Sequence, residues 1–219
     1  MTVIGIIYLI LALGFHMDFK SLPSQQTLCE SIDRVTHQGM DILRLNHPLF
    51  EAAVSLHGAH LLWYKPTSQQ HDVIWLSQAA EFAEDKAIRG GVPVCWPWFG
   101  KLAAPSHGFA RTSLWQLVEF RHSDDKVELV LGLESSEATQ AIWPHQFKLR
   151  LHFQFSDTLK IHLNIENTDK AQWLFSGALH TYFNVGDIDH VLITGMGDTY
   201  SDNLQQNKIC QGRKLLGFN

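Results

Sequence analysis

The residues best suited to chemistry lie between Arg89 and Arg111. Residues 89–100 read RGGVPVCWPWFG, and residues 107–111 read HGFAR. Arginine guanidinium groups are always charged and match phosphate or carboxylate oxygens two at a time, and histidine can exchange a proton near neutral pH. We therefore predict that Arg89, His107 and Arg111 belong to the wall of a pocket for a small anionic ligand.

The residues between these charged groups give the stretch its shape. Gly90 and Gly91 allow a sharp turn or a close approach to a bound group, and the prolines of the run stiffen it. Three aromatic side chains offer flat apolar faces on which a sugar ring can lie, namely Trp96, Trp98 and Phe99. Together with the arginines they favour a polyhydroxylated anion. The alternative is that the aromatic side chains belong to the core and the arginines pair with surface carboxylates.

Four motifs, in chain order, are similar to those of a known family. They are residues 89–100, residues 107–111, IWPH at 142–145 and HTYFNVGD at 180–187. The sequence resembles the D-hexose-6-phosphate mutarotases (glucose-6-phosphate 1-epimerases), within the wider aldose 1-epimerase or galactose mutarotase-like group. The similarity spans roughly residues 31–198. It implies an isomerase of carbohydrate metabolism that interconverts the α and β anomers of glucose 6-phosphate.

The resemblance also implies roles for four side chains. His180 matches the family's general acid, and His107 matches a histidine that binds substrate. Arg89 and Arg111 match the pair that receives the 6-phosphate. Exchange of anomers requires an acid for the ring oxygen and a base for the C1 hydroxyl, each contributing on the order of 10²–10⁴-fold. Because two such groups suffice, we expect no metal and no cofactor, and a hexose 6-phosphate as the small-molecule partner.

The resemblance provides no match for two further functional residues. In the family, an aspartate that binds sugar hydroxyls and a glutamate that serves as base follow a segment like residues 195–198, and we expect this chain to end before them. Three hypotheses follow: a hexose-6-phosphate 1-epimerase that is incomplete at its C-terminus, a non-catalytic sugar-phosphate-binding β-sandwich that lacks the general base, or a structural or carbohydrate-recognition β-sandwich that shares only the fold. We favour the first.

Apolar side chains at every second position predict the strands that hold these residues. The alternation is clearest at 127–133, 147–155 and 159–165. Further strands are expected at 41–45, 52–64 (interrupted at Gly58), 173–185 and 190–195, and a brief helix at 137–142. We predict an all-β fold, a large antiparallel β-sandwich. The resemblance implies the galactose mutarotase-like supersandwich, C-terminally truncated, with a sugar cleft across a concave sheet.

Composition narrows the remaining possibilities. No repeat or linker divides the 219 residues, so we expect a single domain over residues 17–219. The net charge of −5 and the scattered basic residues argue against a nucleic-acid partner. Three cysteines at positions far apart, outside metal-ligand spacing, argue against disulfides and a zinc site and favour the reducing cytoplasm.

Residues 1–16 are predicted to be an apolar extension. The run at 3–15 is shorter than the roughly 20 residues that span a bilayer, so no membrane partner is expected. Its length suits the core of a signal peptide, but no Lys or Arg precedes it. We therefore favour an upstream extension of the reading frame over a signal segment.

Overall fold

The computed structural model describes residues 6–11, 17–194, 198–202, 205, 208–211 and 215–217. In chain order these residues form β1 (Ile6–Leu11), β2 (Ser24–Cys29), β3 (Ile32–His37), β4 (Met40–His47), β5 (Phe50–Ser55), β6 (His60–Pro66), β7 (Val94–Cys95), the 3₁₀-helix η1 (Ala110–Thr112), β8 (Gln116–Ser123), β9 (Lys126–Glu134), α1 (Glu137–Ile142), β10 (Phe147–Phe155), β11 (Leu159–Asn167), β12 (Ala178–Val185), the 3₁₀-helix η2 (Ile188–His190), β13 (Leu192–Thr194), β14 (Thr199–Asp202), β15 (Lys208–Gln211) and β16 (Leu215–Gly217).

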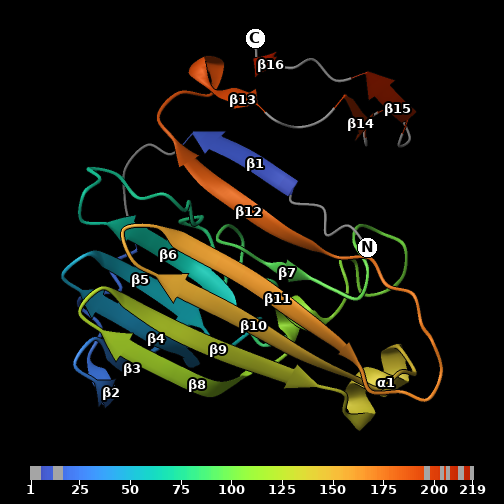
Figure 1. The fold of residues 1–219 in the computed structure, drawn as a ribbon, viewed down its shortest axis with the longest axis horizontal. Coiled ribbons are helices and arrows are strands. Elements are labelled where there is room, and N and C mark those ends of the chain that lie inside the picture. Colours follow the sequence, from blue (N-terminus) through green and yellow to red (C-terminus); the bar gives the residue numbers. More distant parts are fainter. Residues whose placement is uncertain are drawn as a thin grey trace.

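Two antiparallel sheets form the body of the molecule, as two layers (Figure 1). One has the strand order β2-β3-β4-β5-β6, and the other has the order β11-β10-β9-β8. Aromatic side chains join the layers, because the ring of Phe155 on β10 lies 5.6 Å from that of Phe50 on β5 and 6.0 Å from that of Tyr64 on β6. The predicted all-β sandwich is therefore confirmed.

The alternating strands bury one face each, as predicted. On β10 every second side chain from Phe147 to Phe155 is buried and the intervening ones are partly exposed. This strand pairs with β9 on one side and β11 on the other, in continuous antiparallel register. Its apolar face packs into the core between the layers, and its polar face is left on the outside of the molecule.

The five-stranded sheet is covered on both of its faces. Its inner face packs against the four-stranded sheet, and its outer face holds a second apolar cluster. That cluster includes Trp63 of β6 together with Phe82 and Ile88, which follow in the long connection from β6 to β7. The connection that ends at Arg89 is therefore held against the sheet by buried side chains.

A third sheet, with the order β1-β12-β7, carries the His180 strand. β1 pairs with β12 in parallel, from Ile6↔His180 to Leu11↔Val185, whereas β7 pairs with it antiparallel. β1 thus comes from the run predicted to be an apolar extension. In the described part of the chain, none of the helices has the length and apolar character that crossing a membrane requires.

The predicted boundaries hold for the helix and fail for one strand. α1 spans 137–142 as expected, and Ser136 and Thr139 cap its start reciprocally, with hydrogen bonds of 3.3 and 2.8 Å. The strand expected at 173–185 is regular only from Ala178. Before that point the chain runs past Pro97, which accepts a hydrogen bond from Ser176 but has no N–H with which to continue a ladder.

Several strands were not predicted, among them β2, β3 and β8, and one prediction was partly right. β2, β3 and β8 contain many polar residues and lie toward the edges of their sheets. The strand expected at 190–195 is β13 (Leu192–Thr194), preceded by η2, and residue 195 lies outside the described residues. Short β14, β15 and β16 follow as two-stranded pairs with one another or with β13.

Candidate functional site

The Arg89 run and the His180 strand lie side by side. The backbone N–H of His180 donates to the carbonyl of Pro93 at 3.0 Å, and that of Tyr182 donates to the carbonyl of Gly91 at 2.9 Å. Because alternate residues of a strand share a face, His180 and Tyr182 point to the same side, with ring centroids 4.9 Å apart. The first and last sequence motifs are thus joined by backbone hydrogen bonds.

The second motif is bound back onto the first. His107 donates its backbone N–H to the carbonyl of Gly100 at 2.7 Å, and the N–H of Gly100 donates to Nδ1 of His107 at 3.2 Å. Since Nδ1 accepts, the proton of the neutral ring lies on Nε2. Gly108 has φ 72°, and a Cβ there would lie 2.1 Å from the carbonyl oxygen of Trp96, so only glycine fits this turn.

The four predicted site residues line the same pocket. It has a volume of about 240 Å³ and is lined by Ala87, Ile88, Arg89, Pro93, His107, Arg111, His180 and Tyr182. Arg89 arrives from the β6–β7 connection, His107 from the loop after β7, Arg111 from η1 and His180 from β12. Three segments that are distant in sequence, around Arg89, at 107–111 and around His180, therefore present two cations and two imidazoles to a single small volume.

The two histidines are packed edge to face. Their ring centroids lie 5.9 Å apart at an interplanar angle of 89°. Phe99 is half-buried beside them, with its centroid 4.7 Å from that of His107 and 6.0 Å from that of His180. These contacts restrict both imidazole rings, which is what proton transfer to a positioned ligand requires.

Burial keeps both imidazoles neutral at pH 7. Burial is the largest cause that lowers the pKa of His180 to about 4, with smaller contributions from the neighbouring His107 and Arg111. Burial also lowers the pKa of His107, again with a contribution from Arg111. The pocket therefore disfavours additional positive charge, and an anion bound there would reverse part of that effect.

The two arginines are placed differently. Arg89 is exposed, whereas Arg111 is half-buried and donates from Nη2 to the carbonyl of Ser106 at 2.7 Å. The buried Nε of Arg111 has no hydrogen-bond partner. Neither arginine forms an ion pair with a carboxylate among the described residues. The alternative that they serve surface ion pairs is therefore not supported.

Two buried histidines that sequence reasoning missed support the Arg89 turn. His60, at the start of β6, is fully buried and its Nε2 lies 2.7 Å from the carbonyl oxygen of Gly90. His57 is 6% exposed, and its Nε2 lies 3.1 Å from the carbonyl oxygen of Lys86. A carbonyl only accepts, so both rings donate into the segment that carries Arg89. The HGAH pattern at 57–60 is the only signal in the sequence.

The interpretation of the two tryptophans was wrong, and of the two roles considered for Gly90 and Gly91 the structure shows the turn, with φ of 100° and 67°. Trp96 is 0% exposed and Trp98 is 6% exposed, so both belong to the core and neither offers a face to a sugar. The approach that Gly90 and Gly91 allow is to the protein itself, because a Cβ on Gly91 would lie 2.3 Å from the carbonyl oxygen of Leu61. Flat apolar rings suit a core as well as a sugar site, so residue type alone could not separate the two.

Within the residues that the structure describes, no group of three or more His, Cys, Asp or Glu side chains could hold a metal ion. Cys95 is buried against the β12 strand, and burial raises the pKa of its thiol to about 11. The pocket offers a ligand imidazole and guanidinium groups, which suit hydrogen bonding, attraction of an anion and proton transfer.

Comparison with known proteins agrees with this arrangement. The family profile for aldose 1-epimerase matches residues 41–215. A protein of Salmonella typhimurium (strain LT2), provisionally named glucose-6-phosphate 1-epimerase, is 40% identical over 191 residues. That alignment covers 86% of this chain and 63% of the Salmonella protein, so the chain spans less than two thirds of its relative's length.

Solved structures extend the similarity to the fold. The crystal structure of a provisionally assigned mutarotase from Salmonella typhimurium superposes with a TM-score of 0.84 at 38% identity, covering 90% of this chain and 66% of that one. A galactose mutarotase-like protein from Clostridium acetobutylicum shares the fold at 16% identity, with a TM-score of 0.67 over 77% of this chain and 60% of that one. The chain belongs to the aldose 1-epimerase family.

Proposed function

We propose that this chain supplies the phosphate-binding and acid groups of a hexose-6-phosphate 1-epimerase, which interconverts the α and β anomers of glucose 6-phosphate. The observation that carries the proposal is that Arg89, His107, Arg111 and His180 line the same pocket. The name of the Salmonella relative, at 40% identity, supports the choice of substrate.

The two arginines would receive the 6-phosphate. A guanidinium group can donate two parallel hydrogen bonds to the oxygens of a phosphate, and such charge-assisted bonds contribute about 1.5–3 kcal/mol each. Arg111 is held by its bond to the Ser106 carbonyl, so its guanidinium is already oriented. Arg89 is exposed and would provide the outer contact. A neutral hexose would gain nothing from this pair, so the arginines would select for the phosphorylated sugar.

His180 would protonate the ring oxygen as the C1–O5 bond breaks, while a general base removes the proton of the C1 hydroxyl. The open aldehyde then rotates about C1–C2, and the ring closes on the other face as the O5 hydroxyl returns its proton to His180 and the base returns its proton to the new C1 hydroxyl. Because burial lowers the pKa of His180 to about 4, the acid form is scarce in the free pocket. A bound phosphate would offset the charge of Arg111 and raise that pKa, so substrate binding itself would prepare the acid. His107, with its Nε2 proton, would donate a hydrogen bond to a hydroxyl or to the ring oxygen.

A second candidate function is supported by what the pocket does not contain. Among the described residues that line it, there is no carboxylate that could remove the proton from the C1 hydroxyl. Binding of a sugar phosphate without turnover therefore stands as the alternative. The two functions share the arginine pair and differ only in whether exchange of the anomers is accelerated.

The phosphate assignment is tested by measuring affinity for glucose 6-phosphate and for glucose by calorimetry. Arg111→Ala and Arg89→Ala should weaken binding of the phosphorylated sugar by about 10–100-fold, from the loss of a charged hydrogen bond. Binding of glucose should change little. Arg121→Ala is the matched control, because Arg121 is an exposed arginine on β8 that pairs with Glu119. Equal losses for both sugars, or an equal loss in the control, would contradict the assignment.

A further inference from the structure

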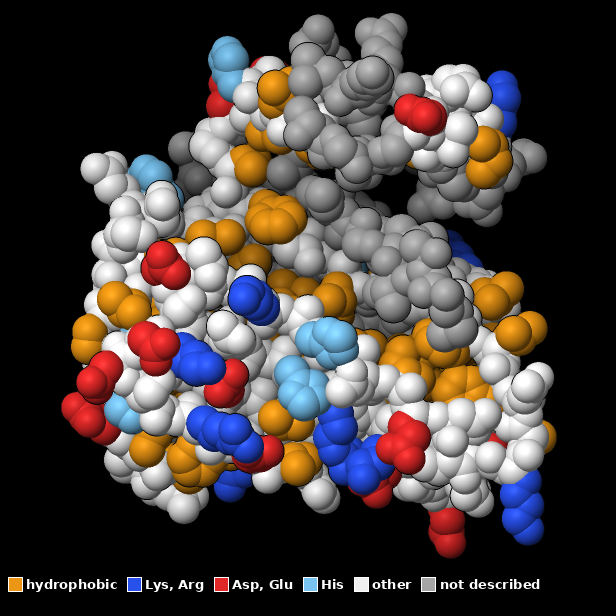
Figure 2. All heavy atoms as spheres, in the orientation of Figure 1, with side chains coloured by type: hydrophobic (Ala, Val, Ile, Leu, Met, Phe, Trp, Pro, Cys, Tyr) orange, Lys and Arg blue, Asp and Glu red, His pale blue; other side chains and the backbone are white. Residues whose placement is uncertain are grey.

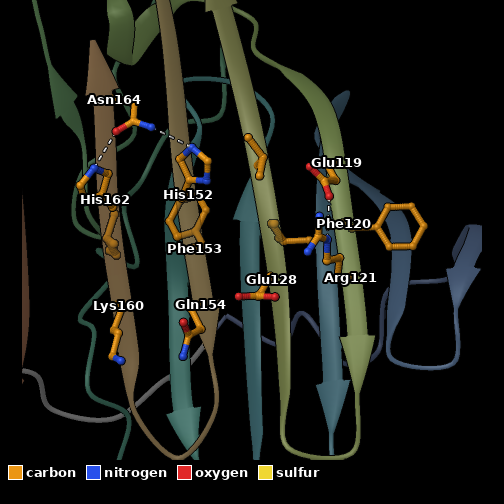
Figure 3. Close-up of a pocket in the computed structure, with 13 residues that line it drawn as sticks. Glu119, Phe120, Arg121, Glu128, His152, Phe153, Gln154, Lys160, His162 and Asn164 are labelled. Carbon is orange, nitrogen blue, oxygen red and sulfur yellow. Dashed lines mark hydrogen bonds and ion pairs between the residues drawn. The ribbon is translucent and has the colours of Figure 1, made fainter.

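The outer face of the four-stranded sheet carries a second group of imidazoles. Figure 2 shows charged and histidine side chains gathered over this sheet, on the face opposite the core. A groove of about 570 Å³ runs across β8, β9, β10 and β11 there, and it shares no lining residue with the pocket around His180. The polar positions of β10 and β11 point into it, including His152, Gln154, His162 and Asn164 (Figure 3).

Two of these side chains are direct cross-strand neighbours. His152 on β10 is paired with His162 on β11 in the antiparallel register, and their ring centroids lie 6.3 Å apart. Side chains that face each other in this way have Cβ atoms about 4.5–5.5 Å apart. The two imidazoles can therefore reach a common point above the sheet by small rotations of their side chains.

One carboxamide already joins the two rings. Nε2 of His162 lies 2.6 Å from Oδ1 of Asn164, and Nδ2 of Asn164 lies 3.4 Å from Nε2 of His152 (Figure 3). An amide oxygen only accepts and an amide nitrogen only donates, so Nε2 of His162 is protonated and Nε2 of His152 accepts through its lone pair. The Nε2 atoms of both rings therefore face the same carboxamide.

We propose that His152 and His162 form a binding site for a divalent transition-metal ion, with Asn164 as an accessory oxygen ligand. Neutral imidazole suits Ni²⁺, Cu²⁺ and Zn²⁺, at nitrogen–metal distances of about 2.0–2.1 Å for zinc, whereas Mg²⁺ and Ca²⁺ require oxygen ligands. Binding through Nε2 of His162 moves the proton of that ring to Nδ1, so the ligand stays a neutral imidazole, and the Asn164 carboxamide turns its oxygen toward the ion. The remaining coordination positions are filled by water.

Charge around the groove neither drives nor blocks this binding. Glu119 pairs with Arg121 at 2.7 Å, and Glu128 pairs with Lys126 at 3.2 Å. Lys160 also lines the groove, at the end away from the histidines (Figure 3). Selectivity for transition-metal ions over Mg²⁺ therefore depends on the two nitrogen ligands. A general cation site would bind Mg²⁺, and this site should not.

Calorimetric titration of the whole chain with Ni²⁺ at neutral pH tests the proposal. His162→Ala and His152→Ala should each weaken Ni²⁺ binding by about 10²-fold, because the second imidazole binds intramolecularly once the first has bound. His71→Ala is the matched control, since His71 is a single exposed histidine, and it should leave the affinity unchanged. Mg²⁺ should give no heat of binding.

His162 is exposed, so its replacement is the variant least able to disturb the fold. Circular dichroism of each variant verifies folding before titration. Unchanged Ni²⁺ affinity in folded His162→Ala, or a loss in His71→Ala as large as in His162→Ala, would overturn the proposal. The half-buried thiols of Cys29 and Cys210 could also bind Ni²⁺, and they are intact in every variant.

Discussion

Replacing the buried His60 should weaken sugar-phosphate binding without touching the pocket. His60 is not a lining residue, but it donates from Nε2 to the carbonyl of Gly90, which directly follows Arg89. In His60→Ala that carbonyl is left buried without its partner, at a cost of about 1–3 kcal/mol, and the space of the imidazole adds a cavity term. We expect the free energy of unfolding to fall by about 3 kcal/mol.

The effect on binding follows from the same hydrogen bond. Once the Gly90 carbonyl is released, the turn that orients Arg89 can move, and up to one charged hydrogen bond to phosphate is lost. That loss corresponds to about a 10–100-fold weaker affinity for glucose 6-phosphate, with affinity for glucose unchanged. His60→Gln keeps an N–H donor at similar reach and should recover part of both losses. Calorimetry with the two sugars and urea unfolding measure the two quantities separately.

His47 provides a matched control for this prediction. It is also a buried histidine, 3% exposed, with Nε2 3.0 Å from the carbonyl oxygen of Ser123 at the end of β8. His47→Ala should destabilise the fold by a similar mechanism and leave affinity for both sugars intact. If His60→Ala binds glucose 6-phosphate as the parent chain does, or if His47→Ala loses as much affinity, the reasoning about the Arg89 turn is refuted.

Three further predictions concern protonation and backbone geometry. Burial lowers the pKa of His60 from 6.5 to about 4, so between these pH values the unfolded chain binds a proton that the folded chain does not. The free energy of unfolding should therefore fall as the pH drops from about 6.5 to about 4, by about 3 kcal/mol from this group. His60→Gln should show a shallower fall in urea unfolding across that range. The pKa of His180, followed by NMR, should rise when glucose 6-phosphate binds and stay low with glucose; equal shifts with both sugars would contradict the role given to phosphate. Gly108→Ala should lower the free energy of unfolding by more than Gly39→Ala, as measured by urea unfolding. Both glycines have positive φ, but of the two only Gly108 would place a Cβ against backbone, 2.1 Å from the Trp96 carbonyl oxygen. Equal losses would show that the backbone strain of positive φ accounts for the whole effect.

The strands that could be predicted from the sequence are those with one buried face and one solvent-exposed face. Along β10 the buried and exposed side chains alternate from Phe147 to Phe155, so a period of two appears directly in the residue types. β5 is buried over most of its length on both faces, and alternation is lost there. β8 is largely exposed at the edge of its sheet, so its residues carry little apolar pattern at all.

The candidate site could be predicted at the positions where the residue type itself indicates the chemistry. Guanidinium and imidazole groups in a stiff loop favour the binding of an anion or the transfer of a proton. The structure does bring Arg89, Arg111, His107 and His180 to one pocket. Trp96 was assigned wrongly because burial depends on the partner, and here Phe147 and Phe109 pack against its ring at 4.6 and 5.8 Å. Such contacts are set by the whole fold.

His60 could not have been found by spacing, since thirty residues separate it from Gly90. Only the antiparallel pairing of β5 and β6, and the return of the chain across β6, bring the two together. The backbone N–H of Val92 donates to the carbonyl of Leu61 at 2.9 Å, which fixes the return at this position. Residues that position a loop at the candidate site are therefore harder to predict than the residues that the loop presents.

The most direct test of the central claim is NMR exchange spectroscopy of the two anomers of glucose 6-phosphate. It should be measured with this chain and with the chain extended by the C-terminal part of the Salmonella relative, beside His180→Asn in each and with glucose as the control. We expect the extended chain to accelerate exchange for the phosphorylated sugar only, and His180→Asn to abolish the acceleration. A folded, sugar-phosphate-binding extended chain that leaves the exchange rate at its uncatalysed value would contradict the epimerase and favour the binding protein.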